Sequence, residues 1–229
     1  EQYSYIDAAK NRGYNILLMD GQLDVAMISM LEQKFEKSRF TRVDSDVIDR
    51  LIAKEEHKEA NLESNQREIL SSVFRSQLPQ IKKVEFNVET QALGENGAPI
   101  MITQSEYMRR MKEMANIQAG MSFYGEMPNM YNLVLNADHK LVKQVLTDAD
   151  NSCKAALEPI ESEMASLNNR RKELQKAQEG KKTEDIPQAE KDELNDIEKK
   201  ISDETTKKQA VLGEYANGNK IIHQLIDLA

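Results

Sequence analysis

Cysteine, tryptophan and long apolar runs are scarce in this chain. It has one cysteine, Cys153, and no tryptophan among 229 residues. A single cysteine can form no disulfide within the chain and no paired-cysteine redox motif, so we expect a reducing compartment, the cytoplasm. No apolar run approaches the roughly 20 residues that a membrane-spanning helix needs. We therefore expect no membrane segment and no membrane partner.

A positive charge balance is missing as well. The formal net charge is −8 and the sequence pI is near 5.1. Proteins that bind nucleic acid or anionic membranes usually present a basic face, so we expect neither kind of partner. The chain starts at Glu1 with neither an initiator methionine nor a signal peptide, and we expect it to be part of a longer protein.

Signatures of catalysis and of cofactor or metal binding are also lacking. The three histidines lie far apart, and none has metal-ligand spacing to another histidine or to the cysteine. The loop after the first apolar run has no glycine-rich phosphate-binding pattern. His139 follows Asp138, but helix capping explains this pair better than acid-base chemistry. We predict no catalytic, cofactor-binding or metal residue and no enzyme activity; a nucleotide-using enzyme stays as an alternative that nucleotide binding would reveal.

The first part of the chain, residues 1–57, is predicted to form a small α/β unit. We expect a helix over residues 2–12 ended by Gly13, a buried strand over 14–19, and a second strand over 40–43. Between the strands, Asp24 should cap a helix that reaches about residue 35. Its buried side would comprise Val25, Ile28, Met30 and Leu31. After a helix over 46–52, a polar run favours a domain boundary near residues 53–61.

The second domain, residues 58–229, is predicted to be α+β. A helix over residues 62–78 precedes strands at 84–88 and 98–102. The turn signal at 94–97 predicts that these two strands form an antiparallel hairpin. A third strand over 131–136 completes a three-stranded antiparallel sheet, and Asp138 should cap the helix that follows.

A methionine-rich amphipathic helix lies between the second and third of these strands. One side carries Tyr107, Met108, Met111, Met114 and Ala115, while the other side is charged. Thr103 and Glu106 have the spacing of a capping box, and Gly120 would end the helix. A methionine stripe at helical spacing is more often core than surface. Methionine side chains also repack against varied partners, so a binding face is the other interpretation.

The last third of the chain is dominated by heptad-like spacing. Apolar residues recur at three- and four-residue intervals from about 153 to 178 and again from 194 to 215, with a breaker at 180–187. This pattern predicts an antiparallel coiled-coil hairpin at about 152–217, with Arg171 and Lys208 at core positions. Gly218 precedes a final apolar helix that should pack either on its own domain or on a partner.

The order of these motifs resembles the bacterial branch of the heat shock protein 90 family of molecular chaperones. The similarity rests on residues 13–20, on 40–43, on the methionine-rich helix and above all on 131–139 followed by Leu141 and Val142. It covers residues 1 to about 148 and resumes from about Lys220, at the end of a middle domain and in a C-terminal dimerisation domain. The predicted hairpin has no counterpart in most members and is interpreted as an insertion.

The resemblance implies an ATP-driven homodimeric chaperone that binds unfolded or partly folded client proteins during stress. The ATP and magnesium sites of the family lie outside this chain. The matching client-binding positions are Tyr107, Met108, Met111 and Met114, and the matching dimerisation positions are Ile222, Leu225 and Ile226. The alternative is a scaffold or adaptor protein whose partner binds the helical hairpin.

Overall fold

The computed structural model describes residues 2–21, 23–47, 51, 60–115, 122–180 and 186–229. The chain divides into two compact units. The sheet unit comprises Glu1–Leu62, Leu78–Val142 and Asp227–Ala229, and the helical unit comprises Glu63–Gln77 and Lys143–Ile226. The predicted division into 1–57 and 58–229 stays a prediction, since most of its boundary lies outside the described residues.

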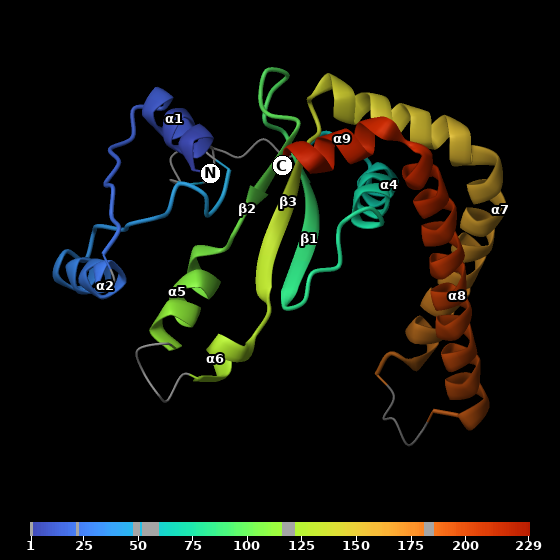
Figure 1. The fold of residues 1–229 in the computed structure, drawn as a ribbon. Coiled ribbons are helices and arrows are strands. Elements are labelled where there is room, and N and C mark those ends of the chain that lie inside the picture. The colour runs from blue at the N-terminus through green and yellow to red at the C-terminus, as the bar shows by residue number, and fades with distance from the viewer. Residues whose placement is uncertain (1, 22, 48–50, 52–59, 116–121, 181–185) are drawn as a thin grey trace. The chain divides into compact units, whose positions relative to one another are not determined.

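The sheet unit is built on three strands in the order β1-β3-β2 (Figure 1). Strand β3 (Asn129–Asn136) is central and pairs in parallel with β1 (Val84–Gln91) and antiparallel with β2 (Ile100–Thr103). The α+β class and the three strands are confirmed. The predicted antiparallel hairpin is wrong, because the sheet is mixed and β3 lies between the other two strands.

A side-chain contact explains why the turn between β1 and β2 does not make a hairpin. Asn136, fully buried at the end of β3, accepts a hydrogen bond from Leu93 N at 3.1 Å and donates one to Gly94 O at 2.9 Å. Asp138 accepts a hydrogen bond from Gly94 N at 2.9 Å. The turn is therefore held by Asn136 at the end of β3 and by Asp138 just after it, and Asp138 serves this turn instead of capping the next helix as predicted.

The N-terminal part of the sheet unit contains helices α1 (Tyr3–Asn11) and α2 (Asp24–Lys34). Gly13 follows α1 with a positive φ of 74°, as a helix-ending glycine should. Residues 14–21 and 38–42 form no strand, so both predicted strands are wrong. Strands need partners for their backbone groups, and the described residues pair neither segment in a sheet.

Helix α2 also differs from its predicted form. Its N-cap position is Leu23, while the Asp24 carboxylate accepts a hydrogen bond from Gly21 N at 2.7 Å. No residue of α2 is buried, and Met30 of the predicted buried side is exposed. The expected helix over 46–52 lies mostly outside the described residues.

The predicted methionine-rich helix is present as α5 (Glu106–Ala115), followed by the short helix α6 (Ser122–Glu126). Its predicted capping box is wrong, because Thr103 is the last residue of β2 and is buried there. The Glu106 carboxylate is instead engaged by arginine side chains. Gly120 lies outside the described residues.

The helical unit consists of α4 (Ser64–Arg75), most of α7 (Lys140–Gln178), α8 (Gln188–Gly218) and most of α9 (Lys220–Leu228). The apolar side of α4 is buried as its spacing predicts, through Ile69, Leu70, Val73 and Phe74. Helix α7 is continuous across Pro159, so the helix expected after Asp138 and the first helix of the expected hairpin are one helix. Its neighbour α8 also packs against α4.

Helices α7 and α8 lie side by side and share a small apolar core (Figure 1). Leu167 and Leu174 of α7 pack with Ile197 of α8, and Ile201 covers this cluster. Towards the connection, Arg170 on α7 forms an ion pair with Glu193 on α8 at 2.7 Å. The chain thus turns back on itself as predicted, whereas heptad packing of a coiled coil stays a prediction.

Candidate functional site

The methionine face of α5 is neither core nor freely exposed surface. Tyr107 is 62% exposed, whereas Met108, Met111 and Met114 are partly buried. No residue of α5 is fully buried. The three methionines are therefore neither fully buried, as a core stripe would be, nor largely exposed, as we would expect of an open binding face.

Helix α6 holds the C-terminal end of α5 in place. The two helices pack together, and a side chain at Gly125 would meet the Ala115 side chain at 3.8 Å. Lys112 Nζ also donates a hydrogen bond to Asn129 Oδ1 at the start of β3, at 2.6 Å. Phe123 of α6 is exposed, so aromatic as well as methionine surface is available around this helix pair.

The charged face of α5 is bound to the segment of residues 32–44. Arg110 Nη1 forms an ion pair with Glu32 Oε2 at 2.7 Å, and its guanidinium also donates to the Phe40 carbonyl. Arg109 Nη1 forms an ion pair with Asp44 Oδ1 at 2.9 Å. The sequence places these arginines on the side away from the methionines but gives no sign of their distant partners.

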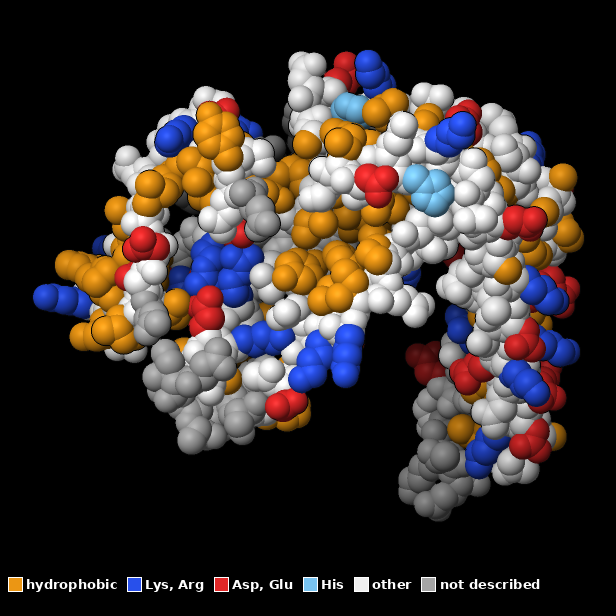
Figure 2. All heavy atoms as spheres, in the orientation of Figure 1, with side chains coloured by type: hydrophobic (Ala, Val, Ile, Leu, Met, Phe, Trp, Pro, Cys, Tyr) orange, Lys and Arg blue, Asp and Glu red, His pale blue; other side chains and the backbone are white. Residues whose placement is uncertain are grey.

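Arg42 adds a third link to the same face. Its Nη2 contacts both carboxylate oxygens of Glu113, at 2.8 and 2.9 Å, and its Nη1 lies 3.8 Å from Glu106 Oε2. We call the whole group the ion-pair clamp; it comprises Glu32, Arg42, Asp44, Glu106, Arg109, Arg110 and Glu113. Figure 2 shows basic and acidic side chains gathered next to each other near the start of α5.

The clamp perturbs the acidity of two of its carboxyl groups. Burial alone would raise the pKa of Glu32, but hydrogen bonds from Arg110 and from Phe40 N, with the charge of Arg110, lower it overall. Burial would likewise raise the pKa of Asp44, but hydrogen bonds from Arg109 and Gln2, with the charge of Arg109, outweigh burial and lower this pKa overall. Both carboxylates are thus held in the charged form that the arginines require.

The residues predicted to dimerise lie on α9. Ile222 and Leu225 are buried within their own chain, and Ile226 is partly buried. Leu228 is 80% exposed. A single chain does not test dimerisation, so the prediction stands as such. Burial of Ile222 and Leu225 within the chain agrees with the other interpretation of this apolar face, in which α9 packs on its own chain.

Lys208 is the one strongly polar side chain buried where α4, α7 and α8 meet in the described part of the helical unit. Its Nζ contacts Asn65 Oδ1 at 2.9 Å and Glu68 Oε2 at 3.0 Å on α4, and Glu161 Oε1 at 3.1 Å on α7. Heptad spacing correctly placed this lysine at a core position. Arg171, the other predicted core cation, is only partly buried.

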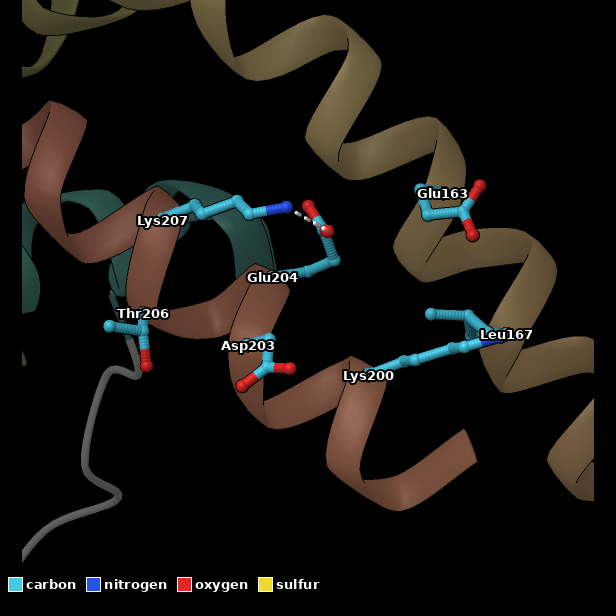
Figure 3. A pocket seen from close by; sticks show the side chains of 7 residues that line it. All are labelled: Glu163, Leu167, Lys200, Asp203, Glu204, Thr206 and Lys207. Atoms are coloured by element: carbon cyan, nitrogen blue, oxygen red, sulfur yellow. Dashed lines mark hydrogen bonds and ion pairs between the residues drawn. The ribbon is translucent and has the colours of Figure 1, made fainter. Parts of the chain in front are cut away.

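A shallow hollow of about 570 Å³ lies between α7 and α8 (Figure 3). Glu163 and Leu167 line it from α7, and Lys200, Asp203, Glu204, Thr206 and Lys207 line it from α8. Lys207 is already paired with Glu204 at 2.6 Å. The hollow shows no arrangement for catalysis. Among the described residues, no cluster of histidine, cysteine and carboxylate side chains could hold a metal ion.

None of the described helices combines the length and the apolar character that a helix needs to cross a bilayer.

Comparison with known proteins gives consistent matches. The family model for Hsp90 protein matches residues 1–167. Chaperone protein HtpG of Bacteroides fragilis is 67% identical over 229 residues, which cover all of this chain and 34% of that protein. The Bacteroides thetaiotaomicron and Porphyromonas gingivalis proteins of the same name are 66% and 45% identical, again over the whole chain. No solved structure gives a significant match.

Two details of these matches bear on the predictions. The chain spans about a third of the length of these relatives. The family match ends at residue 167, inside α7, while the Bacteroides and Porphyromonas proteins align through α8 and α9.

The relatives are chaperones, which does not favour the scaffold alternative. With a family match over most of its length and this level of identity to its relatives, the chain belongs to the Hsp90 family.

Proposed function

We propose that this chain is the C-terminal part of an ATP-dependent chaperone and that it contacts unfolded or partly folded clients through the methionine face of α5. The observation that carries the proposal is the state of this face. An amphipathic helix with no fully buried residue presents Tyr107 to solvent and keeps three flexible methionines partly accessible. Such a face can repack against varied apolar segments.

The proposal assigns no catalytic step to this chain. ATP and magnesium would be bound by parts of the longer protein, and this chain would contribute client contact and homodimerisation. A cytoplasmic location belongs to the same proposal, as does the absence of nucleic-acid and membrane partners. The family membership and the chaperone relatives support the proposed chaperone function.

Homodimerisation is proposed to involve α9. Of the predicted residues, Ile226 retains exposed surface, whereas Ile222 and Leu225 would support the contact from within their own unit. Light scattering on the full-length protein measures its mass in solution. We expect a dimer that Ile226→Asp converts to a monomer, and an unchanged mass for this variant would exclude Ile226 from the interface.

The hairpin of α7 and α8 is proposed to be an antiparallel coiled coil with an accessory role. Its outer surface is rich in charged side chains (Figure 2), which suits a solvated spacer. Replacing residues 152–217 with a short linker should leave client binding intact. Loss of client binding with preserved α5 structure would instead make the hairpin the main functional element.

The client proposal is tested by replacing Met108, Met111 and Met114 together with serine. The ligand is fluorescently labelled α-lactalbumin, kept unfolded by reduction and carboxymethylation, and its binding is measured by fluorescence anisotropy. We expect affinity to fall about tenfold, the effect of losing one or two strong contacts in an interface. Unfolding stability should change far less than the 2–5 kcal/mol typical of truncating a fully buried side chain.

A matched control uses the three methionines of the N-terminal segment. Met19, Met27 and Met30 are all exposed, and their replacement by serine removes equivalent apolar surface elsewhere. This control should leave affinity unchanged. Equal loss in both triple variants would show that the client binds exposed apolar surface without preference for α5, against the proposal.

A further inference from the structure

The ion-pair clamp joins α5 to residues that lie 64 to 78 positions earlier in the chain. Its outer partners come from α2 and the segment that follows α2, not from the sheet that delivers α5. Glu32 contributes from α2, while Asp44 and Arg42 contribute from the later part of the segment. One helix face therefore receives charged contacts from several points along residues 32–44.

The clamp grips the side of α5 that lies opposite the methionines. At about 100° per residue, Glu106, Arg109, Arg110 and Glu113 share one side of the helix, and Met108 and Met111 project from the other. Any rotation or withdrawal of the gripped face must therefore move the methionine face as well, because a helix turns as one body.

Four of the charged side chains in the clamp are largely shielded from solvent, which strengthens their contribution to holding α5. The side chains of Glu32, Arg110, Arg109 and Asp44 are only 12 to 18% exposed. Two backbone contacts reinforce the ion pairs: Phe40 N donates to Glu32 at 2.7 Å, and Gln104 N donates to the Asp44 carbonyl at 3.1 Å. Charge pairs in such surroundings are screened by solvent less than pairs on an open surface.

We propose that residues 32–44 act through this clamp as a control element that sets how far the methionine face of α5 is exposed. The inference rests on the proposed function, in which that face contacts clients, and it adds a means of regulating the contact. When the clamp holds, the three methionines stay partly covered. When residues 32–44 move or the ion pairs break, α5 loosens and the methionines become more accessible.

The test breaks the clamp without touching α5. The double variant Glu32→Gln/Asp44→Asn removes two charges from the 32–44 side while keeping side-chain shape and the sequence of α5. Oxidation of individual methionines by dilute hydrogen peroxide is followed by mass spectrometry, which reports the accessibility of each sulfur. Met164 on α7, also partly buried, serves as the internal reference in the other compact unit.

We expect Met108, Met111 and Met114 to oxidise roughly five- to tenfold faster in the double variant, since about 1 kcal/mol of lost coupling gives a factor of that size. Met164 should react at the wild-type rate. Glu193→Gln, which removes the exposed partner of Arg170, is the matched control and should change none of these rates. Unchanged rates at the three α5 methionines would overturn the inference.

A second measurement covers the case in which the double variant fails to fold, which circular dichroism would reveal. The single variant Asp44→Asn removes only the charge that pairs with Arg109, and it goes through the same oxidation assay. Faster oxidation of the α5 methionines relative to Met164 would support the clamp, and an unchanged ratio would overturn it. The oxidation assay contains no client protein, so it tests the clamp separately from the proposed function. If the proposed function is wrong, replacing the methionines will not change client affinity, but breaking the clamp will still speed their oxidation.

Discussion

Replacing Lys208 with methionine removes the charge that joins three helices of the helical unit. The lysine is 4% exposed, and its ammonium group contacts Asn65, Glu68 and Glu161 at 2.9 to 3.1 Å. Methionine is similar in length, so the packing of the side-chain stem is largely kept. The change therefore isolates the polar contacts from the apolar ones.

The size of the effect follows from the exposure of the partners. Removing one member of a fully buried ion pair costs about 3–5 kcal/mol, because the remaining charge is left without solvent. The side chains of Glu68 and Glu161 are 46 and 38% exposed and can rehydrate in part. We therefore expect Lys208→Met to lower the free energy of unfolding by about 2 kcal/mol. Lys208→Ala should cost about 1–2 kcal/mol more, since it also leaves a cavity.

Urea denaturation followed by far-ultraviolet circular dichroism measures this loss, since the helical unit supplies much of the helix signal. Lys207→Met is the matched control. Lys207 precedes Lys208 on α8 and its side chain is 61% exposed, so loss of its surface ion pair with Glu204 should leave the stability nearly unchanged. A Lys208→Met variant as stable as the wild-type protein, or more stable, would refute the reasoning, because it would mean that desolvation cancels the three contacts.

Three further predictions concern other parts of the chain. Glu32 and Asp44 have folded pKa values below their ordinary 4.5 and 3.8, so the stability they add is present above about pH 5.5 and is lost as pH falls through the folded values. When the free energy of unfolding is measured at decreasing pH, the variant Glu32→Gln/Asp44→Asn should lack this loss. A pH profile identical to that of the wild-type protein would contradict a stabilising contribution of the clamp. Leu225→Ala should cost about 2–4 kcal/mol in urea unfolding because Leu225 is buried, whereas Leu228→Ala should stay within about 0.5 kcal/mol. Burial raises the pKa of the Cys153 thiol, so Ellman's reagent should label it much faster in urea than in the native protein; equal rates would contradict its burial.

Local patterns predicted the elements that carry their own signal. The apolar spacing of α4, the strand β3 and the amphipathic pattern of α5 each encode an element within a short stretch. Lys208 at a core position was also visible, because heptad spacing marks inward positions whatever residue occupies them.

Features set by distant contacts could not be read in the same way. The turn signal before β2 is real, yet the turn is held by hydrogen bonds to Asn136 at the end of β3. The sheet is mixed because β3 lies between β1 and β2 and pairs in parallel with β1. An apolar run at residues 14–19 has strand character but finds no strand partner among the described residues. Arg109 and Arg110 are evident as a charged face, whereas their pairing with Asp44 and Glu32 depends on the folded chain.

The most direct test of the account asks which surface touches the client. Tyr107 is replaced by the photo-reactive aromatic residue p-benzoylphenylalanine, and the protein is irradiated with labelled, unfolded α-lactalbumin. Tyr3 and Phe35, which are also exposed aromatic residues, provide matched positions away from α5. The account predicts strong cross-linking from position 107 and little from positions 3 and 35. Cross-linking from position 3 or 35 with none from 107 would contradict the assignment of α5 as the client-binding helix.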